Sequence, residues 1–185
     1  MPSKAEIRRD ISALLRLPPD VRAEKSARLC EAIAASPAWQ SARTVAIFAP
    51  QPREPDVEML WSRGSGKSFA YPRVTEGRLD LHRVDSLYEL APGAFGVREP
   101  AADLAHAVSP GTLDLILVPG VAFTADGARL GRGGGFYDRL LASLPAHVCK
   151  IGACFSLQLL GELPKEPHDQ HVDFLATENG LLRAR

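Results

Sequence analysis

The segment GRGGGFYDRL, residues 131–140, combines the residue types that a phosphate site needs. Its four glycines precede a helical pattern, and free backbone N–H groups at a helix start bind anions where no Cβ intervenes. Arg129 and Arg132 flank them with fork-shaped donors for phosphate oxygens, and Asp138 could hold a magnesium ion that bridges phosphates. A second interpretation stays open. The glycines could form only a tight turn, Asp138 could interact favourably with the helix dipole, and the arginines could be solvated. The glycines are Gly131, Gly133, Gly134 and Gly135.

Two common phosphate-binding motifs do not fit the sequence. GSGKS at residues 64–68 resembles the end of a Walker A loop, but Trp61 stands where the first glycine is required, and the segment leads from a helix into a strand. GRGGGF lacks the third glycine of the dinucleotide fingerprint because Phe136 occupies that position, and no acidic residue closes a following strand. A phosphate site here would therefore be of another kind.

Two further pairs of residues could bind a ligand. Lys4 and Arg8 lie four residues apart on one face of an expected helix, although a solvated face is the more common role of such a pair. Glu54 and Asp56 follow an expected strand, where a carboxylate could bind ring nitrogens of a ligand. Asp56 could equally cap the next helix.

The segment PKEPHDQHVD near the C-terminus concentrates acidic residues and histidines. They could form a metal cluster, but zinc requires better-spaced ligands, and polar loops often have this composition. A solvated loop is therefore the alternative interpretation. The residues are Glu166, His168, Asp169, His171 and Asp173.

Short apolar runs alternating with helical patterns predict the elements that must position these residues. We expect strands at residues 44–50, 68–72, 79–84, 113–119, 150–155 and 171–177. We expect helices from the capping box SKAE at Ser3 to before Pro18, and at residues 20–35, 56–63, 86–90 and 136–143, with a turn at SPAWQSA.

This alternation predicts the fold class. We expect a three-layer α/β/α fold with a mostly parallel sheet and N-terminal helices before the first strand. Neither repeats nor a linker divide the chain, so we expect a single domain over residues 1–185, with a helical part at 1–42 and a sheet part at 43–185. Ligands of such sheets gather at the carboxyl ends of the strands.

Composition narrows the classes of partner. The chain has 185 residues with 22 basic and 22 acidic side chains, so nothing indicates a nucleic acid or a membrane surface as partner. Cys30, Cys149 and Cys154 lack CxxC spacing and lie in apolar surroundings, which predicts reduced, buried thiols. Neither a signal peptide nor a membrane span is apparent, and we expect a cytoplasmic monomer that binds small molecules.

Several blocks taken together resemble the 5-formyltetrahydrofolate cyclo-ligase family, also called 5,10-methenyltetrahydrofolate synthetases. They are KAEIRRDISALLR, APQPREPD, YPRV, LDLILVPGVAF, RLGRGGGFYDRLL and FSLQLLGELPKEPHDQHVD, and they run almost from end to end. The resemblance implies an enzyme that uses ATP and Mg²⁺ to convert 5-formyltetrahydrofolate to 5,10-methenyltetrahydrofolate, with release of ADP and phosphate.

The resemblance also implies site residues. ATP contacts fall on Lys4, Ala5, Glu6, Ile7 and Arg8, and on Arg129, Leu130, Gly131, Arg132, Gly133, Gly134, Gly135, Phe136 and Tyr137. Folate contacts fall on Gln51, Asp56, Arg132, Gly133, Gly134, Gly135 and Phe136, with Glu54 a further acidic candidate. Metal ligands fall on Asp138 and Asp173, and the catalytic roles on Arg132 and Asp138.

The chain departs from the family pattern at three positions. Phe136 stands where many members have tyrosine, Gly134 replaces a lysine of some members, and Pro55 interrupts an acidic, aliphatic, acidic triplet. Phe136 and Gly134 leave one alternative function, a non-catalytic module that binds folate or a nucleotide. A second alternative is a sugar-phosphate isomerase-like enzyme with a related α/β sheet, which needs no ATP and gives Lys4 and Arg8 no role.

Overall fold

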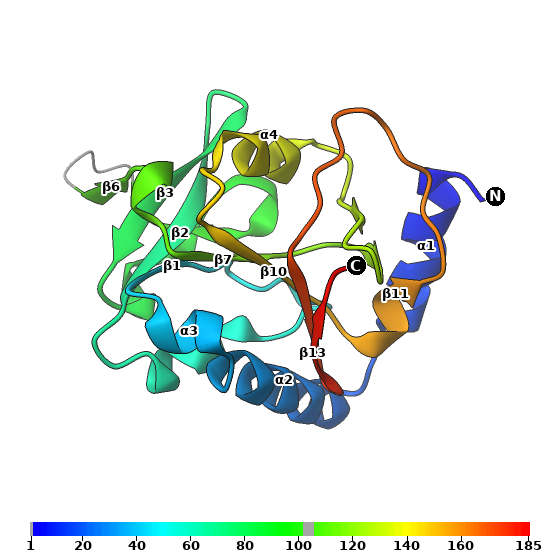
Figure 1. Cartoon of the computed structure of the whole chain (residues 1–185), viewed down its shortest axis with the longest axis horizontal. Helices are drawn as coiled ribbons and strands as arrows, with labels where there is room; N and C mark the ends of the chain where they lie inside the picture. Colours follow the sequence, from blue (N-terminus) through cyan, green and yellow to red (C-terminus); the bar gives the residue numbers. More distant parts are fainter. Residues whose placement is uncertain (1, 102–105) are drawn as a thin grey trace.

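The computed structural model describes residues 2–101 and 106–185, which are built around one large sheet (Figure 1). Its strand order is β13-β12-β10-β7-β1-β2-β3-β6. The strands are β1 (Thr44–Ala46), β2 (Ser68–Thr75), β3 (Arg78–Val84), β6 (Ala107–Val108), β7 (Leu115–Val118), β10 (Cys149–Ala153), β12 (Phe174–Thr177) and β13 (Gly180–Arg183). The strands predicted at residues 68–72, 79–84, 113–119, 150–155 and 171–177 are all present.

The centre of the sheet is parallel and its edges are antiparallel. Strands β12, β10, β7, β1 and β2 pair in parallel, whereas β13, β3 and β6 join antiparallel. All four residues of β7 are buried, as expected for a strand covered on both faces. Strand β1 is shorter than predicted, because its ladder ends at Ala46 although Ile47, Phe48 and Ala49 remain buried.

Helices cover both faces of the sheet, which confirms the three-layer prediction (Figure 1). Helices α2 (Pro19–Ala34) and α3 (Pro37–Ser41) lie below the sheet in this view, where Leu29 and Ile33 of α2 pack with Leu115 and Leu117 of β7. Helix α4 (Phe136–Ser143) lies on the other face, where Leu140 joins a second apolar cluster. The predicted turn at SPAWQSA is wrong in part, because this segment contains α3.

Helix α1 (Lys4–Leu14) covers neither face of the large sheet. It begins at the predicted capping box, in which Ser3 and Glu6 bond each other's backbone. Its buried residues Ile7 and Ile11 pack with Phe155 against a small sheet of order β11-β8-β9. The strands of that sheet are β8 (Ala122–Thr124), β9 (Arg129–Leu130) and β11 (Leu159–Leu160). Since β9 leads directly into the glycines, α1 is placed beside them.

Shorter elements complete the described part of the chain. The helices predicted at 56–63 and 86–90 are 3-10 helices, η1 (Val57–Arg63) and η2 (Leu87–Glu89), rather than α-helices. A hairpin of β4 (Ala91–Pro92) and β5 (Arg98–Glu99), with η3 (Ala94–Gly96) at its tip, was not predicted. The remaining short helices are η5 (Pro110–Thr112) and η6 (Ser156–Gln158).

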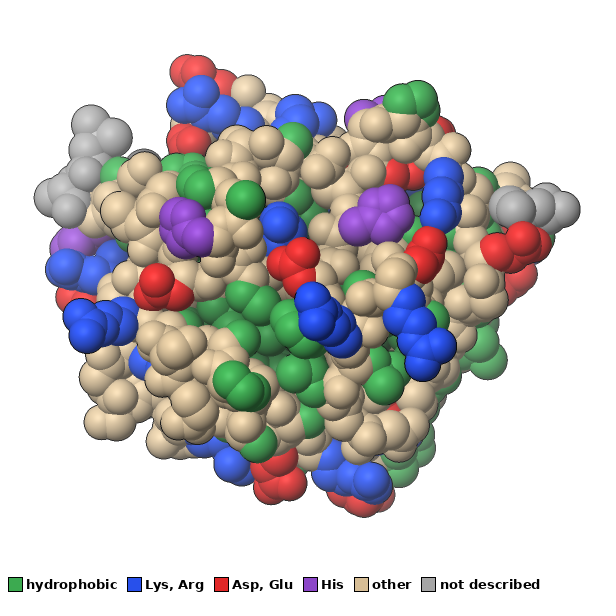
Figure 2. Space-filling model, in the orientation of Figure 1, with side chains coloured by type: hydrophobic (Ala, Val, Ile, Leu, Met, Phe, Trp, Pro, Cys, Tyr) green, Lys and Arg blue, Asp and Glu red, His purple; other side chains and the backbone are tan. Residues whose placement is uncertain are grey.

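The surface charges agree with the balanced composition, and two of the three cysteines are buried as predicted. Basic and acidic side chains are interspersed over the face in Figure 2, so that face carries no extended field of one sign. The three cysteines are free; Cys30 and Cys154 are buried and Cys149 is half-buried. Within the described ranges, none of the helices has the length and apolar character needed to cross a membrane.

Candidate active site

A cavity of about 430 Å³ opens at the carboxyl ends of the parallel strands, where ligands of such sheets bind. Phe48 and Ala49 follow β1, Gly120 follows β7, and Pro72 and Val74 belong to β2. The glycine segment closes a second side, and the β4–β5 hairpin a third. Residues from these two elements that line the cavity are Ala94, Phe95, Val97, Glu99, Gly131, Arg132, Gly134, Gly135, Phe136, Tyr137 and Asp138.

The glycine segment has the backbone of an anion site. Gly133 and Gly135 have φ values of 108° and 65°, a region that side-chain-bearing residues rarely adopt. Gly135 is the N-cap of α4, and no side chain in the described part of the chain caps this helix. The first N–H groups of α4 therefore lack an intrahelical partner at the edge of the cavity.

Arginines from two helices, α1 and α4, converge on these glycines. Arg8 of α1 donates from Nε to the carbonyl oxygen of Gly131 at 2.9 Å. Arg139 of α4 donates to the carbonyl oxygen of Gly134 at 3.0 Å, and its guanidinium lies 5.2 Å from the centre of the Phe136 ring. These contacts place positive charge beside the helix start, which a phosphate group would require.

Arg129 and Asp138 form a buried ion pair in the cavity wall. The Arg129 side chain is 3% exposed, and its NH2 donates to Oδ1 of Asp138 at 2.7 Å. NH1 donates to the carbonyl oxygen of Pro119 at 3.2 Å, whereas Nε has no hydrogen-bond partner among the described residues. Burial, with a smaller contribution from Glu54, raises the pKa of the neighbouring Tyr137 hydroxyl above its ordinary value.

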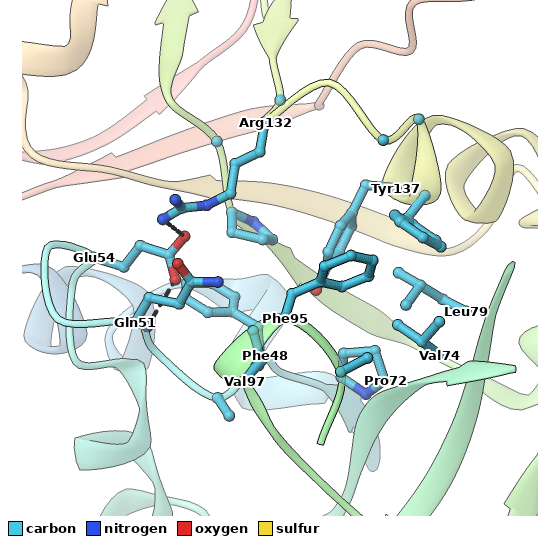
Figure 3. Close-up of a pocket in the computed structure, with 18 of the residues that line it drawn as sticks. Phe48, Gln51, Glu54, Pro72, Val74, Leu79, Phe95, Val97, Arg132 and Tyr137 are labelled. Carbon is cyan, nitrogen blue, oxygen red and sulfur yellow. Dashed lines mark hydrogen bonds and ion pairs between the residues drawn. The ribbon is translucent and has the colours of Figure 1, made fainter. Parts of the chain in front are cut away.

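The loop after β1 supplies the polar end of the cavity (Figure 3). Glu54 lines the cavity, and its Oε1 accepts from NH2 of Arg132 at 2.9 Å. Its Oε2 accepts from the backbone N–H of Gln51 at 2.9 Å, so one carboxylate joins this loop to the glycine segment. Asp56 is exposed and faces away: its Oδ1 caps η1 by accepting from the Glu58 N–H at 3.1 Å.

The apolar wall faces this polar end. Figure 3 shows the rings of Phe48, Phe95 and Tyr137 around one space, with Val74 and Leu79 beside them. The Phe95 and Phe136 ring centroids are 5.8 Å apart. A flat, partly polar ring against this wall, with a phosphate group at the glycine segment, would match this division of the cavity.

Comparison with known proteins decides the family. A model of the 5-formyltetrahydrofolate cyclo-ligase family matches residues 1–178. The chain belongs to this family. A 5-formyltetrahydrofolate cyclo-ligase of Mycolicibacterium smegmatis is 34% identical over 153 residues, which cover 78% of this chain and 79% of that protein. A mouse protein of the same name is 29% identical, and the match covers 96% of this chain and 94% of the mouse protein.

Solved structures agree with this membership in the cyclo-ligase family. The 5,10-methenyltetrahydrofolate synthetase of Aquifex aeolicus has a TM-score of 0.87 and 34% identity, covering 98% of this chain and 93% of that one. The 5,10-methenyltetrahydrofolate synthetase of Mycoplasma pneumoniae has a TM-score of 0.74 at 22% identity, and the match covers 95% of this chain and 98% of that one. At this identity the likeness supports the fold alone. The predicted three-layer fold is therefore the cyclo-ligase fold.

The two aspartates that the resemblance assigns to a metal lie apart. Asp138 is one of three described carboxylates that line the cavity, and it lies nearest in sequence to the glycine segment. One carboxylate is enough for Mg²⁺, which commonly binds one or two carboxylates together with substrate phosphates. Asp173 precedes β12, where its Oδ2 accepts from the backbone N–H of Lys150 at 2.8 Å. Lys150 lies near the start of β10, so Asp173 is at the amino ends of the parallel strands. The structure does not bring Asp173 to the cavity.

The N-terminal residues that the resemblance assigns to ATP do not act as one group. Arg8 reaches the glycine segment, but Ile7 is buried in the α1 core and Glu6 belongs to the capping box. Lys4 Nζ instead lies 2.9 Å from Asp169 Oδ2 and 3.4 Å from Glu166 Oε2. Ala5 is exposed on α1, and Leu130 is buried in the apolar cluster that contains Ile7 and Ile11 of that helix.

The acidic loop near the C-terminus keeps both of its interpretations. Ligand atoms of Glu166, His168 and Asp169 lie within 4.8 Å of one another, a grouping that exposed acidic loops often show without a metal. Lys4 forms ion pairs with two of these carboxylates. Burial alone would raise the pKa of Asp169, but the hydrogen bond from Lys4 helps to lower it. The loop is therefore joined to α1 rather than to the cavity.

Sequence reasoning did not identify three residues at or beside the cavity. Arg139 carries positive charge beside Gly134, and its spacing of four residues from Gly135 was the available signal. Phe95 and Glu99 belong to the hairpin that was not predicted. Short strands of two residues leave too little periodicity to reveal such an element.

Proposed function

We propose that this chain is an ATP- and Mg²⁺-dependent enzyme that converts 5-formyltetrahydrofolate to 5,10-methenyltetrahydrofolate, releasing ADP and phosphate. The observation that carries the proposal is one cavity in a cyclo-ligase family member that joins an aromatic wall to a glycine-rich helix start surrounded by arginines. The wall would hold the folate ring, and the helix start the phosphates.

The residues divide into two binding groups. The amides of Gly133, Gly134 and Gly135 would bind ATP phosphate oxygens, with charge supplied by Arg8 and Arg132. Mg²⁺, when bound, would neutralise phosphate charge at Asp138. The folate would contact Gln51, Glu54 and Phe136. Tyr137 belongs to the same proposed ATP region, and Lys4 would join it only by leaving its ion pair with Asp169. We assign Asp56 and Asp173 structural roles.

The chemistry requires alignment and charge neutralisation. A formamide oxygen is a weak nucleophile and a poor leaving group. Its attack on the γ-phosphorus breaks the bond to ADP and gives a phosphorylated iminium; N10 then attacks the formyl carbon and loses its proton to water. The carbon–oxygen bond breaks, phosphate leaves with its electron pair, and the five-membered ring is closed. Arg132 and the helix amides would stabilise the transferred charge.

The proposal extends to the domain organisation, the oligomeric state and the compartment of the chain. Both parts of the chain serve one site, because Arg8 of the helical part meets Gly131 of the sheet part. We therefore propose that residues 1–185 form a single domain. We also propose that the chain acts as a monomer and that it works in the cytoplasm on small molecules rather than on nucleic acids.

The direct test is to mix the purified chain with 5-formyltetrahydrofolate, ATP and Mg²⁺ and to follow methenyltetrahydrofolate absorbance. We expect product only when all three are present, with one ADP formed for each folate converted. Conversion without ATP would indicate different chemistry. A folded protein that binds folate and forms no product would be a binding module, and the proposed function would be wrong.

A further inference from the structure

Glu99 is a buried carboxylate in the otherwise apolar part of the cavity. It is 5% exposed and lines the cavity beside Val74, Leu79 and Val97. Burial of a carboxylate is unfavourable unless hydrogen-bond donors surround it. The position of Glu99 therefore raises the question of which donors it serves.

The protein satisfies this carboxylate only in part. Oε1 accepts from the Val74 N–H at 3.3 Å, which is long for a bond to an ionised oxygen. Oε2 lies 3.8 Å from NH1 of Arg73, beyond hydrogen-bond distance, and that NH1 donates instead to the carbonyl oxygen of Pro100 at 2.7 Å. A carboxylate has about four acceptor sites, so capacity remains for donors of a ligand.

The hairpin fixes where the carboxylate points. Val97 and Glu99 alternate with Arg98 and line the cavity, whereas Arg98 turns away and binds Glu58 at 2.5 Å. Gly93 packs against the Glu99 side chain, because a Cβ on Gly93 would lie 2.5 Å from the carboxyl carbon of Glu99. The side chain is thus held by close packing, while residues 2–101 and 106–185 give its oxygens only the long contacts with Val74 and Arg73.

We propose that Glu99 binds the pyrimidine edge of the folate ring system. That edge carries adjacent N–H donors, on N3 and on the 2-amino group, which match the two oxygens of one carboxylate. The inference rests on the proposed function, since it assigns a residue of the same site to part of the same substrate. Glu99 is then a substrate-binding residue that determines specificity and orientation.

The other two described carboxylates of the cavity, Glu54 and Asp138, do not suit this role. Asp138 is paired with Arg129 at 2.7 Å and belongs to the helix that follows the glycine segment. Glu54 already accepts from Arg132 and from the Gln51 N–H, and both contacts lie at the polar end near the glycine segment. With the pyrimidine edge held by Glu99 at the apolar end, the side of the ring that carries the formyl group faces the glycine segment. This orientation brings the formyl oxygen toward the phosphate site.

The test compares binding of two ligands to three proteins without ATP. The ligands are 5-formyltetrahydrofolate and an analogue with hydrogen in place of the 2-amino group, and Kd is measured by calorimetry. The proteins are the unaltered chain, Glu99→Gln and the control Glu31→Gln, whose carboxylate is 61% exposed and paired with Arg63. Thermal unfolding of each variant checks the fold.

We expect Glu99→Gln to weaken 5-formyltetrahydrofolate binding roughly 10- to 100-fold, as loss of a charge-assisted hydrogen bond does. The unaltered chain should disfavour the analogue by a similar factor, Glu99→Gln should discriminate much less, and Glu31→Gln should behave like the unaltered chain. Equal affinity of the unaltered chain for both ligands would overturn the assignment, even where Glu99→Gln does not fold. Equal discrimination by a folded Glu99→Gln would overturn it too. Both results leave the proposed function intact, whereas failure of the unaltered chain to bind 5-formyltetrahydrofolate would overturn the function itself.

Discussion

Arg132 is the exposed cation that the proposed phosphate site depends on most. Its side chain is 56% exposed, and its partner among the described residues is Glu54, so Arg132→Ala should leave the chain folded. Some stability should be lost, because the Glu54 carboxylate is 10% exposed and loses this partner. Loss of its charge, together with an unpaired Glu54 near the phosphates, should lower kcat/KM for ATP about 100-fold. Steady-state kinetics measures this, with Arg9→Ala, 73% exposed at a distance on α1, as the matched control. Unchanged turnover of Arg132→Ala would refute its role.

Asp138 and Asp173 are both carboxylates, yet only Asp138 lies at the cavity. Asp138→Asn should raise the Mg²⁺ concentration at half-maximal rate several-fold, because a neutral amide binds Mg²⁺ less strongly. It should also destabilise the fold by about 2 kcal/mol, since the buried Arg129 guanidinium loses its charged partner.

Asp173→Asn is the matched comparison for this magnesium titration. Its carboxylate lies at the opposite end of the parallel strands, so the Mg²⁺ midpoint should stay that of the unaltered chain. A midpoint shifted by Asp173→Asn and not by Asp138→Asn would show that the metal binds elsewhere.

Among the elements, those specified by local sequence were predictable. The capping box at Ser3, the apolar run of β7 and the glycines before α4 each act within a few residues, and all three appear as expected. The cap that Asp56 makes at η1 is also local, and it is one of the two roles that its position predicted. The direction in which Asp173 turns depends instead on its contact with Lys150, 23 residues earlier in the chain. Spacing alone could not give that direction, and therefore could not exclude Asp173 from the site.

The start of α4 also yields a prediction at the scale of an element. Gly135 caps this helix with φ of 65°, and a Cβ there would lie 2.9 Å from NH1 of Arg139. Gly135→Ala should destabilise the fold by about 1–2 kcal/mol and weaken ATP binding, because it strains the backbone and displaces the arginine. Chemical unfolding and nucleotide titration measure both effects. Gly161→Ala, which has open space around its Cβ, should leave both unchanged.

For the whole molecule, buried and hydrogen-bonded acids determine how stability depends on pH. Backbone hydrogen bonds from Thr44 and Arg43 lower the pKa of Asp114, and hydrogen bonds from Lys25 and Ser156 outweigh burial and lower the pKa of Glu178. The unfolded chain therefore binds more protons in acid than the folded one.

This stabilisation is present above about pH 4.5, the ordinary value for a glutamate, and decreases as the pH falls toward the lower folded values. The free energy of unfolding should decline accordingly, as urea titrations from pH 6 to pH 3 would measure. Glu178→Gln should be less stable at pH 6 and should show a shallower decline, whereas exposed Glu162→Gln should follow the unaltered chain. Identical slopes for all three proteins would contradict the role of Glu178.

The buried thiols determine how the free energy of unfolding changes at alkaline pH. Burial raises the pKa of Cys30 to about 12 and that of Cys149 to about 11, and it also raises the pKa of Cys154. Since unfolded thiols ionise near pH 9.0, stability is complete below that pH and should decrease as the pH rises toward 11. In the folded protein these thiols should remain protonated and react slowly with iodoacetamide at pH 8.5, because the thiolate is the reactive form. Alkylation should accelerate only with denaturant or at the pH where unfolding begins; rapid reaction of the folded protein at pH 8.5 would show that the thiols are not held in their protonated form.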